Sequence, residues 1–273
     1  MKKWQEFELN AAKYLQSAVN MRHISFKASG GSDSTTSDIK VNFDKDFDKK
    51  LLFNIEAKLM PAQAGQFVVL FNEGKFEYSS NNKDSLNEFS QKIIAHMNKH
   101  IEYYSNCGTA GSELKCDNNL FLNWILAHYN SKKARFIITS KKPNSFDRSF
   151  IKICPLSAFA NNFEIKAIYR IKKSGSVHMP KKDLEEVKRL LTAKFKNMFS
   201  IDDKGQVKFS SINPNKQKIG DKFYLSSEEG LFKITKLSST KNANVIFSLS
   251  FIGEASNSGL SELKDEIQKE ISA

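Results

Sequence analysis

Two hydrophobic periodicities divide the chain into helices and strands. Near the start of the chain, Trp4, Phe7, Ala11, Tyr14 and Leu15 recur every three or four residues, which predicts an amphipathic helix. Apolar residues at this spacing, or in one short continuous run, predict helices over residues 3–17, 85–104, 120–129, 180–198 and 261–271. The helices are therefore spread along the whole chain.

Alternation of apolar and polar residues predicts strands between these helices. Residues 39–43 and 51–58 alternate on either side of a charged turn, so they are expected to form a hairpin. Residues 25–37, which end in glycines and small hydroxyl residues, indicate a loop. Further strands are predicted at residues 67–71, 76–78, 135–139, 150–153, 164–171, 207–209, 222–225, 231–237 and 245–252.

The order of these elements predicts an α/β fold with an appended part. Helices and strands alternate up to about residue 200, whereas short strands separated by Gly, Asn and Ser dominate beyond it. We therefore expect a core over residues 1–200 with inserted elements, and a small β-rich C-terminal subdomain over residues 201–273.

Composition narrows the class of protein. The chain has 273 residues, of which 40% are hydrophobic and 11% aromatic, so a packed core is expected rather than disorder. It holds no apolar run near the ~20 residues of a membrane span, and no apolar segment follows the N-terminal lysines as in a secretory signal. Three cysteines cannot form a disulfide framework. These features predict a protein of the bacterial cytoplasm.

The positive charge is concentrated in one quarter of the chain. The net charge is +12, and residues 132–200 alone carry 17 Lys and Arg against 5 Asp and Glu. The rest of the chain is therefore neutral overall. Such a block favours a polyanionic partner, with nucleic acid as the leading candidate. The alternative is a lysine-rich solvated surface.

The predicted hairpin carries the candidate chemistry. Side chains alternate on a strand, so Glu56 and Lys58 share one face of residues 51–58, while the apolar Ile55 and Ala57 share the other. Asp38 stands at the entry to the partner strand and can reach the same place. The alternative for such a pattern alone is an exposed strand face with a cross-strand ion pair.

This set of residue types suits phosphodiester hydrolysis. Carboxylate oxygens of Asp38 and Glu56 are the hard ligands that Mg²⁺ prefers, and the carbonyl of Ala57 would complete the shell. Bound Mg²⁺ lowers the pKa of a coordinated water and stabilises charge on the phosphate. Lys58 would lie close to both the attacking water and the phosphate. Asp38, Glu56 and Lys58 are therefore the candidate catalytic residues.

The order of these features resembles the PD-(D/E)XK nuclease superfamily over residues 4–71. The segment Phe7-Glu8 with Ala11 and Ala12 is similar to the family's first core helix, Ser37-Asp38 to its first metal-binding segment, and Glu56-Ala57-Lys58 to its (D/E)xK strand. Ser37 stands where the family name has proline. The resemblance implies a mixed β-sheet flanked by helices, DNA hydrolysis with Mg²⁺, and a supporting role for Glu8 at the metal. Asp33 competes with Asp38 for the first position, but Asp38 is followed directly by the strand.

Several polar residues outside this motif are candidate DNA contacts. Gln63 and Gln66 follow the active strand, where some members of the superfamily place a Gln near the phosphate, although a polar turn is an equal interpretation. Within the basic block, hydroxyl groups and cations gather around two loops and the start of a helix, as phosphate contacts do. The candidates are Gln66, Lys141, Lys142, Arg148, Arg170, Lys172, Lys173, Ser174, Ser176, His178, Lys181 and Lys182.

The motif occupies only the first quarter of the chain, which leaves about 200 residues for recognition. This length and the basic block favour a sequence-specific, Mg²⁺-dependent endonuclease of double-stranded DNA, most like a type II restriction endonuclease. Cutting both strands of a palindrome favours a homodimer. Two alternatives remain: a structure-specific or repair nuclease of the same superfamily, and a non-catalytic nucleic-acid-binding protein.

Overall fold

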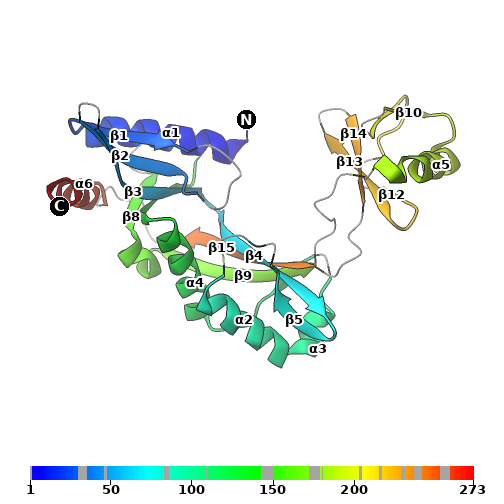
Figure 1. Cartoon of the computed structure of the whole chain (residues 1–273), viewed down its shortest axis with the longest axis horizontal. Coiled ribbons are helices and arrows are strands. Elements are labelled where there is room, and N and C mark those ends of the chain that lie inside the picture. The colour runs from blue at the N-terminus through cyan, green and yellow to red at the C-terminus, as the bar shows by residue number, and fades with distance from the viewer. Residues whose placement is uncertain are drawn as a thin grey trace. The chain divides into compact units, whose positions relative to one another are not determined.

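The chain forms two compact units, which are described separately here. The computed structural model describes residues 2–29, 36–45, 48–80, 82, 86–108, 110–142, 150–171, 179, 181–202, 205–214, 217–228, 231–236, 242–252 and 259–273 (Figure 1). The first unit comprises Met1–Cys107, Gly111–Tyr169 and Asn244–Ala273, and the second comprises Gly108–Ala110 and Arg170–Ala243.

The first unit contains a mixed sheet with the strand order β1-β2-β3-β7-β8. Its strands are β1 (Ile24–Ala28), β2 (Ile39–Lys45), β3 (Asp48–Leu59), β7 (Ala134–Ser140) and β8 (Ile151–Pro155). The predicted hairpin is present as β2 and β3, which pair antiparallel, and β3 then pairs parallel with β7. The mixed sheet and its flanking helices confirm the predicted fold class.

One strand of this sheet falls where a loop was expected. The prediction of a loop from residue 25 is wrong for β1, because Ile24 and Phe26 are buried while Lys27 is exposed. This short alternation pairs with β2 along its whole length, from Ile24 opposite Phe43 to Ala28 opposite Ile39. The glycine-rich segment that dominated the sequence pattern comes only after the strand.

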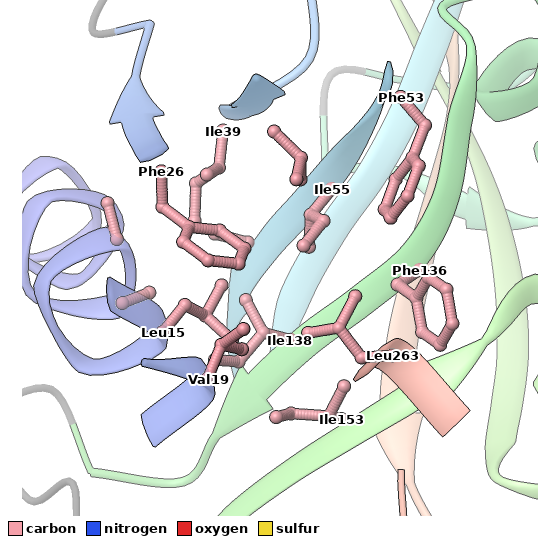
Figure 2. Packing of buried hydrophobic residues seen from close by; sticks show 14 of the residues in the cluster. Leu15, Val19, Phe26, Ile39, Phe53, Ile55, Phe136, Ile138, Ile153 and Leu263 are labelled. Carbon is pink, nitrogen blue, oxygen red and sulfur yellow. The ribbon is translucent and has the colours of Figure 1, made fainter. Parts of the chain in front are cut away.

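Helices from opposite ends of the chain contribute to the core against this sheet. The first is α1 (Lys3–Val19) and the second is α6 (Gly259–Ser272). Figure 2 shows Leu15 and Val19 of α1 and Leu263 of α6 in one cluster with strand residues such as Ile55 and Ile138. Ala57 belongs to the same cluster, so the alternating residues Glu56 and Lys58 lie on the other face of β3.

A second sheet of the first unit has the order β5-β4-β15-β9-β6. Its strands are β4 (Ala62–Asn72), β5 (Lys75–Tyr78), β6 (Ser112–Glu113), β9 (Phe163–Ile171) and β15 (Ala243–Phe251), and the helical segments of this region are α2 (Glu88–Lys99), α3 (Ile101–Ser105), α4 (Asn118–Ser131) and the 3-10 turn η1 (Leu156–Asn161). Aromatic rings join strands to helix, since Trp124 of α4 stacks on Phe247 at 4.3 Å between ring centroids.

The helix expected over residues 85–104 is divided in the structure. Asn87 caps α2 by accepting a hydrogen bond from the backbone N–H of Ser90. Its last helical residue is Lys99, because His100 has the non-helical dihedrals φ −117° and ψ 43°. The short α3 then begins at Ile101. A continuous apolar stripe in the sequence did not reveal this change of direction.

Among its described residues, the second unit contains a five-stranded sheet, the short 3-10 helix η2 and the α-helix α5. The sheet has the order β10-β11-β14-β13-β12. Its elements are η2 (Lys181–Asp183), α5 (Leu184–Phe195), β10 (Phe199–Ile201), β11 (Gln206–Phe209), β12 (Lys218–Ile219), β13 (Phe223–Glu228) and β14 (Leu231–Lys236). Val187, Leu191 and Phe195 of α5 share a core with Val207 and Leu225.

This division differs from a boundary at residue 200. The helix α5 belongs to the second unit because its apolar face is buried against that unit's strands. At the other end, β15 and α6 return to the first unit, where β15 lies between β4 and β9. In the described part of the chain, no helix combines the length and the apolar character needed to cross a membrane.

Candidate active site

The predicted catalytic residues meet at one point on the face of β3. Ile39 lies opposite Ile55 in the hairpin, so Asp38, just before β2, lies beside the next part of β3. The backbone N–H of Ala57 donates to Asp38 Oδ2 at 2.8 Å. Lys58 Nζ lies 2.7 Å from Asp38 Oδ2 and 2.8 Å from Glu56 Oε2. One ammonium group therefore bridges two carboxylates.

Glu56 is the most deeply buried member of this group, with 0% of its surface exposed. A second ammonium, that of Lys132, lies 3.5 Å from Glu56 Oε1. Burial acts to raise the pKa of Glu56, but Lys58 and Lys132 outweigh it and lower the pKa to about 2. The carboxylate is therefore ionised at neutral pH, although it is shielded from solvent.

The pKa values of Lys58 and Asp38 are both raised within this cluster, which favours the charged form of Lys58 and the neutral form of Asp38. Burial acts to lower the pKa of the Lys58 ammonium, but Glu56 and Asp38 together raise it well above its ordinary value. Burial raises the pKa of Asp38, and repulsion from Glu56 adds to this effect against the attraction of Lys58. Lys58 is thus held in its charged form by the two carboxylates that it bridges.

Glu8 is coupled to this cluster from α1. It is a buried residue of that helix. Burial is the largest cause that raises its pKa, to about 7, and the next is repulsion from Asp38. Lys58 and Glu56 also act on Glu8. Glu8 is therefore coupled electrostatically to Asp38, Lys58 and Glu56.

The sequence reasoning missed the roles of Lys132 and Asn54 at this site, and it gave no contact for the side chain of Ser37. Lys132 lies at the C-terminal end of α4, and its carbonyl accepts hydrogen bonds from Asn54 Nδ2 at 2.6 Å and Ser37 Oγ at 3.4 Å. The Asn54 and Ser37 side chains thus attach β3 and the segment just before β2 to the turn after α4. A lysine at a helix end before a central strand was the available signal, but only the fold brings it to Glu56.

The donor set of the site is acidic. Among the residues that the structure describes, no three His, Cys, Asp or Glu side chains are grouped as a multidentate metal site requires. What the site offers is the pair Asp38 and Glu56 around one ammonium, and a lysine ammonium lies within 3.5 Å of each Glu56 oxygen. A pair of converging carboxylates with a lysine between them can bind a cation and a phosphate together.

The described DNA-contact candidates lie in different places. Gln66 is exposed on β4 and accepts a hydrogen bond from Asn244 Nδ2 at 3.3 Å. Lys141 and Lys142 are exposed directly after β7, and because Leu59 lies opposite Ser140, they follow the same end of the sheet as Lys58. Arg170 is exposed near the end of β9. Lys181 and Lys182 belong to the second unit.

Six further DNA-contact candidates lie outside the described residues: Arg148, Lys172, Lys173, Ser174, Ser176 and His178. The competing carboxylate Asp33 also lies outside them.

The structure shows a further basic residue, Lys152, near the candidate site. Lys152 of β8 lies opposite Thr139 of β7, and Thr139 lies opposite Lys58 of β3. Lys58, Thr139 and Lys152 therefore form one row on the same face of the sheet. The ammonium groups of Lys152 and Lys141 each lie 5.7 Å from the centre of the Phe251 ring.

Comparison with known proteins places this site in a family. No protein-family model matches the chain, and a search of curated proteins finds no match. Among solved structures, HhaI endonuclease in complex with DNA is 34% identical to the chain with a TM-score of 0.70, and the alignment covers 100% of both chains. This full-length similarity is in accord with the Asp38, Glu56 and Lys58 cluster on β2 and β3. The chain therefore belongs to the PD-(D/E)XK nuclease superfamily, in which it is most like a type II restriction endonuclease.

Proposed function

We propose that the protein is a Mg²⁺-dependent, sequence-specific endonuclease that hydrolyses phosphodiester bonds of double-stranded DNA. The observation that carries the proposal is the convergence of Asp38 and Glu56 on the Lys58 ammonium, which lies 2.7 Å from Asp38 Oδ2 and 2.8 Å from Glu56 Oε2. The full-length similarity to an endonuclease solved with DNA supports the substrate class. Chemistry and family thus point to the same reaction.

The residues at the site fit a divalent cation. Mg²⁺ is commonly bound through one or two protein carboxylates, with waters and substrate phosphates as its other ligands. Asp38 and Glu56 supply two carboxylates that already share a cationic partner, and Glu56 is ionised at neutral pH. We assign Asp38, Glu56 and the carbonyl of Ala57 as ligands, with Glu8 in support. When bound, Mg²⁺ supplies an activated water and neutralises charge on the phosphate.

Lys58 is the residue of this chain that would act on the reacting atoms. Its pKa is raised, so it is an ammonium group throughout the neutral range and serves as a donor rather than as a base. From its place between the carboxylates it would orient the attacking water and donate to a phosphate oxygen. Its side chain is 16% exposed, the same fraction as that of its partner Asp38.

DNA recognition requires a larger surface than this site. The 17 basic residues of the segment 132–200 would attract the phosphate backbone, and Lys141 and Lys142 follow the end of the sheet that carries Lys58. We assign Gln66 and the DNA-contact candidates already named within this segment, which do not include Lys132, to DNA contact. A palindromic site would be cut on both strands by a homodimer.

Digestion of phage DNA tests the proposal. The protein is incubated with the DNA in Mg²⁺, and in EDTA as the control. Discrete fragments in Mg²⁺ and intact DNA in EDTA are expected. Intact DNA in both, with a shift on a native gel, would instead indicate a non-catalytic binding protein.

The same digest separates the second enzyme class. A structure-specific or repair nuclease of the superfamily would give smears on phage DNA, or would cut only branched duplexes such as four-way junctions. A Holliday-junction substrate is therefore included beside the linear DNA. Cleavage of the junction alone would contradict sequence-specific cleavage while leaving the assignment of the catalytic residues intact.

A further inference from the structure

Lys132 contacts both β3, through Asn54 and Glu56, and the residue Ser37 that shortly precedes β2. We propose that it is a positioning residue for the nuclease reaction, and that its ammonium holds the plane of the Glu56 carboxylate. This inference rests on the proposed function. Lys132 Nζ lies 3.5 Å from Glu56 Oε1, while Lys58 Nζ lies 2.8 Å from the other oxygen, Oε2. Each oxygen of the Glu56 carboxylate therefore has the ammonium group of a different lysine beside it.

These two contacts restrain the terminal torsion of the Glu56 side chain, which sets the plane of its carboxylate. The terminal torsion of a Glu side chain has broad wells, so burial alone does not fix the plane of its carboxylate. Glu56 Oε2 faces the ammonium that also contacts Asp38. A second cation on Oε1 opposes rotation of the carboxylate away from Asp38. Lys132 thereby keeps one oxygen of Glu56 directed at the place where both carboxylates meet.

Burial of the Lys132 side chain supports a specific role. Only 8% of it is exposed, and lysine is seldom so buried unless it is paired. The ammonium also lies 5.8 Å from the centre of the Tyr129 ring, one turn earlier on α4. Tyr129 is itself anchored, because its hydroxyl donates to the carbonyl of Ala64 at 3.1 Å. The lysine is held by a fixed ring on one side and by Glu56 on the other.

The backbone of Lys132 is positioned independently of its side chain. Its carbonyl accepts the hydrogen bonds from Asn54 and Ser37, and the next carbonyl, that of Lys133, accepts from the backbone N–H of Asn54 at 2.9 Å. A substitution at position 132 removes none of these acceptors. The role of the ammonium can therefore be tested while the hairpin stays attached to the turn after α4.

The first measurement is the single-turnover rate of cleavage at saturating protein, with DNA affinity measured in Ca²⁺. Lys132→Met is expected to lower the rate by about 10- to 100-fold, as loss of a residue that orients a metal ligand does, and to leave DNA affinity within about twofold. Lys132→Arg is expected to restore most of the rate, because it keeps the charge. Lys115→Met is the control, because Lys115 also lies over a tyrosine ring, at 5.5 Å from Tyr103, but belongs to neither the site nor the basic segment.

Several outcomes would overturn the proposal. A Lys132→Met protein that cuts at the wild-type rate would do so, and so would equal losses of rate and DNA affinity, which would make Lys132 a phosphate contact. Failure of Lys132→Arg to restore the rate would also contradict a role for the charge. Where Lys132→Met does not fold, Lys132→Gln takes its place with the same expectations.

Crystal structures of the metal-free wild-type and Lys132→Met proteins give a readout that needs no activity. The Glu56 carboxylate is expected to turn or to lose order in Lys132→Met and to keep its plane in Lys132→Arg. An unchanged Glu56 in Lys132→Met would contradict the proposal even if cleavage were impaired. If the wild-type protein cuts no DNA, the proposed function fails, and the crystal structures still decide whether Lys132 holds Glu56.

Discussion

Lys58 Nζ lies 2.7 Å from Asp38 Oδ2, although the two residues are 20 positions apart in the chain. The hairpin of β2 and β3 brings them together, and the backbone N–H of Ala57 holds the same carboxylate oxygen at 2.8 Å. Asp38 is therefore fixed by β3 before any substrate binds. This arrangement reduces the reorganisation that a metal-dependent reaction would require.

Removing either carboxylate is expected to abolish cleavage. Asp38→Asn and Glu56→Gln each keep the shape of the side chain but remove one anionic ligand from the proposed Mg²⁺ site. Each variant should lose several kcal/mol of transition-state stabilisation by the metal, which lowers the cleavage rate by at least about 10³-fold. Single-turnover cleavage in Mg²⁺ measures the rate, and a native gel in Ca²⁺ measures DNA binding, which should persist.

Asp33→Ala is the matched control for these two variants, because Asp33 is the other carboxylate before the first hairpin strand. It should cut at close to the wild-type rate. An inactive Asp33 variant beside an active Asp38 variant would exchange their roles. Wild-type cleavage by Glu56→Gln would contradict the assignment of the site as a whole.

Replacing Lys58 by Met is expected to affect both catalysis and stability. Without the ammonium, Asp38 and Glu56 lose their shared partner, and breaking a buried ion pair in this way costs about 3–5 kcal/mol. The Tm in EDTA should therefore fall, and Mg²⁺ should raise it more than it raises the Tm of the wild type. Cleavage should fall by orders of magnitude while DNA still binds in Ca²⁺. Equal losses of binding and rate would limit Lys58 to holding the substrate.

The hairpin that carries the candidate catalytic residues could be predicted from the sequence because its signals are local. Ile55 and Ala57 had to be buried, so Glu56 and Lys58 had to share the opposite face. Asp38 stood directly before an alternating strand. These relations depend on the two-residue period of a strand and on one turn, and both are visible within about 20 residues of sequence.

The parts that could not be predicted depend on contacts between distant segments. Lys132 reaches Glu56 only because β7 pairs with β3 and so brings the end of α4 to the hairpin. Nothing in the local pattern of residues 243–251 shows that β15 lies between β4 and β9. The same limit applies to α6, whose spacing predicted a helix but not the sheet that it covers. Periodicity shows which face of an element is buried, but not against which element.

Glu8 is expected to make the stability of the metal-free protein depend on pH. Burial, followed by repulsion from Asp38, raises its pKa from 4.5 to about 7. The folded state therefore binds more protons than the unfolded state between these values, so the free energy of unfolding should fall as the pH rises from about 4.5 to about 7. Glu8→Gln should lose this part of the dependence and be more stable than the wild type at pH 8.

Urea unfolding in EDTA measures this effect. Tryptophan fluorescence reports the first unit, because Trp4 and Trp124, the two tryptophans of the chain, both belong to it. Glu6→Gln is the control, since Glu6 lies on the same helix. Parallel pH profiles for the wild type and Glu8→Gln would contradict a raised pKa at Glu8.

The last helix is expected to stabilise the first unit through its apolar face more than through its charges. Leu263 is fully buried in the cluster that α6 shares with the sheet, so Leu263→Ala should cost about 2–5 kcal/mol (Figure 2). Arg135 of β7 forms ion pairs with Glu266 and Glu270, but 40% of its side chain is exposed, so Arg135→Met should cost about 1 kcal/mol or less. Urea unfolding followed by tryptophan fluorescence compares the two, and a larger loss for Arg135→Met would reverse this order.

The basic segment 132–200 is expected to supply the long-range attraction for DNA, because the rest of the chain is neutral overall. Replacing Lys141, Lys142, Lys181 and Lys182 by Gln should weaken binding to cognate and random duplexes alike. Each lost phosphate contact should reduce the slope of log affinity against log salt by about one. A salt titration of binding in Ca²⁺ measures this slope.

The control for this prediction replaces four exposed lysines outside the segment, Lys13, Lys75, Lys99 and Lys269, by Gln. Because both variants lose the same net charge, an equal drop in slope for the two would show that total charge, rather than the basic segment, attracts DNA.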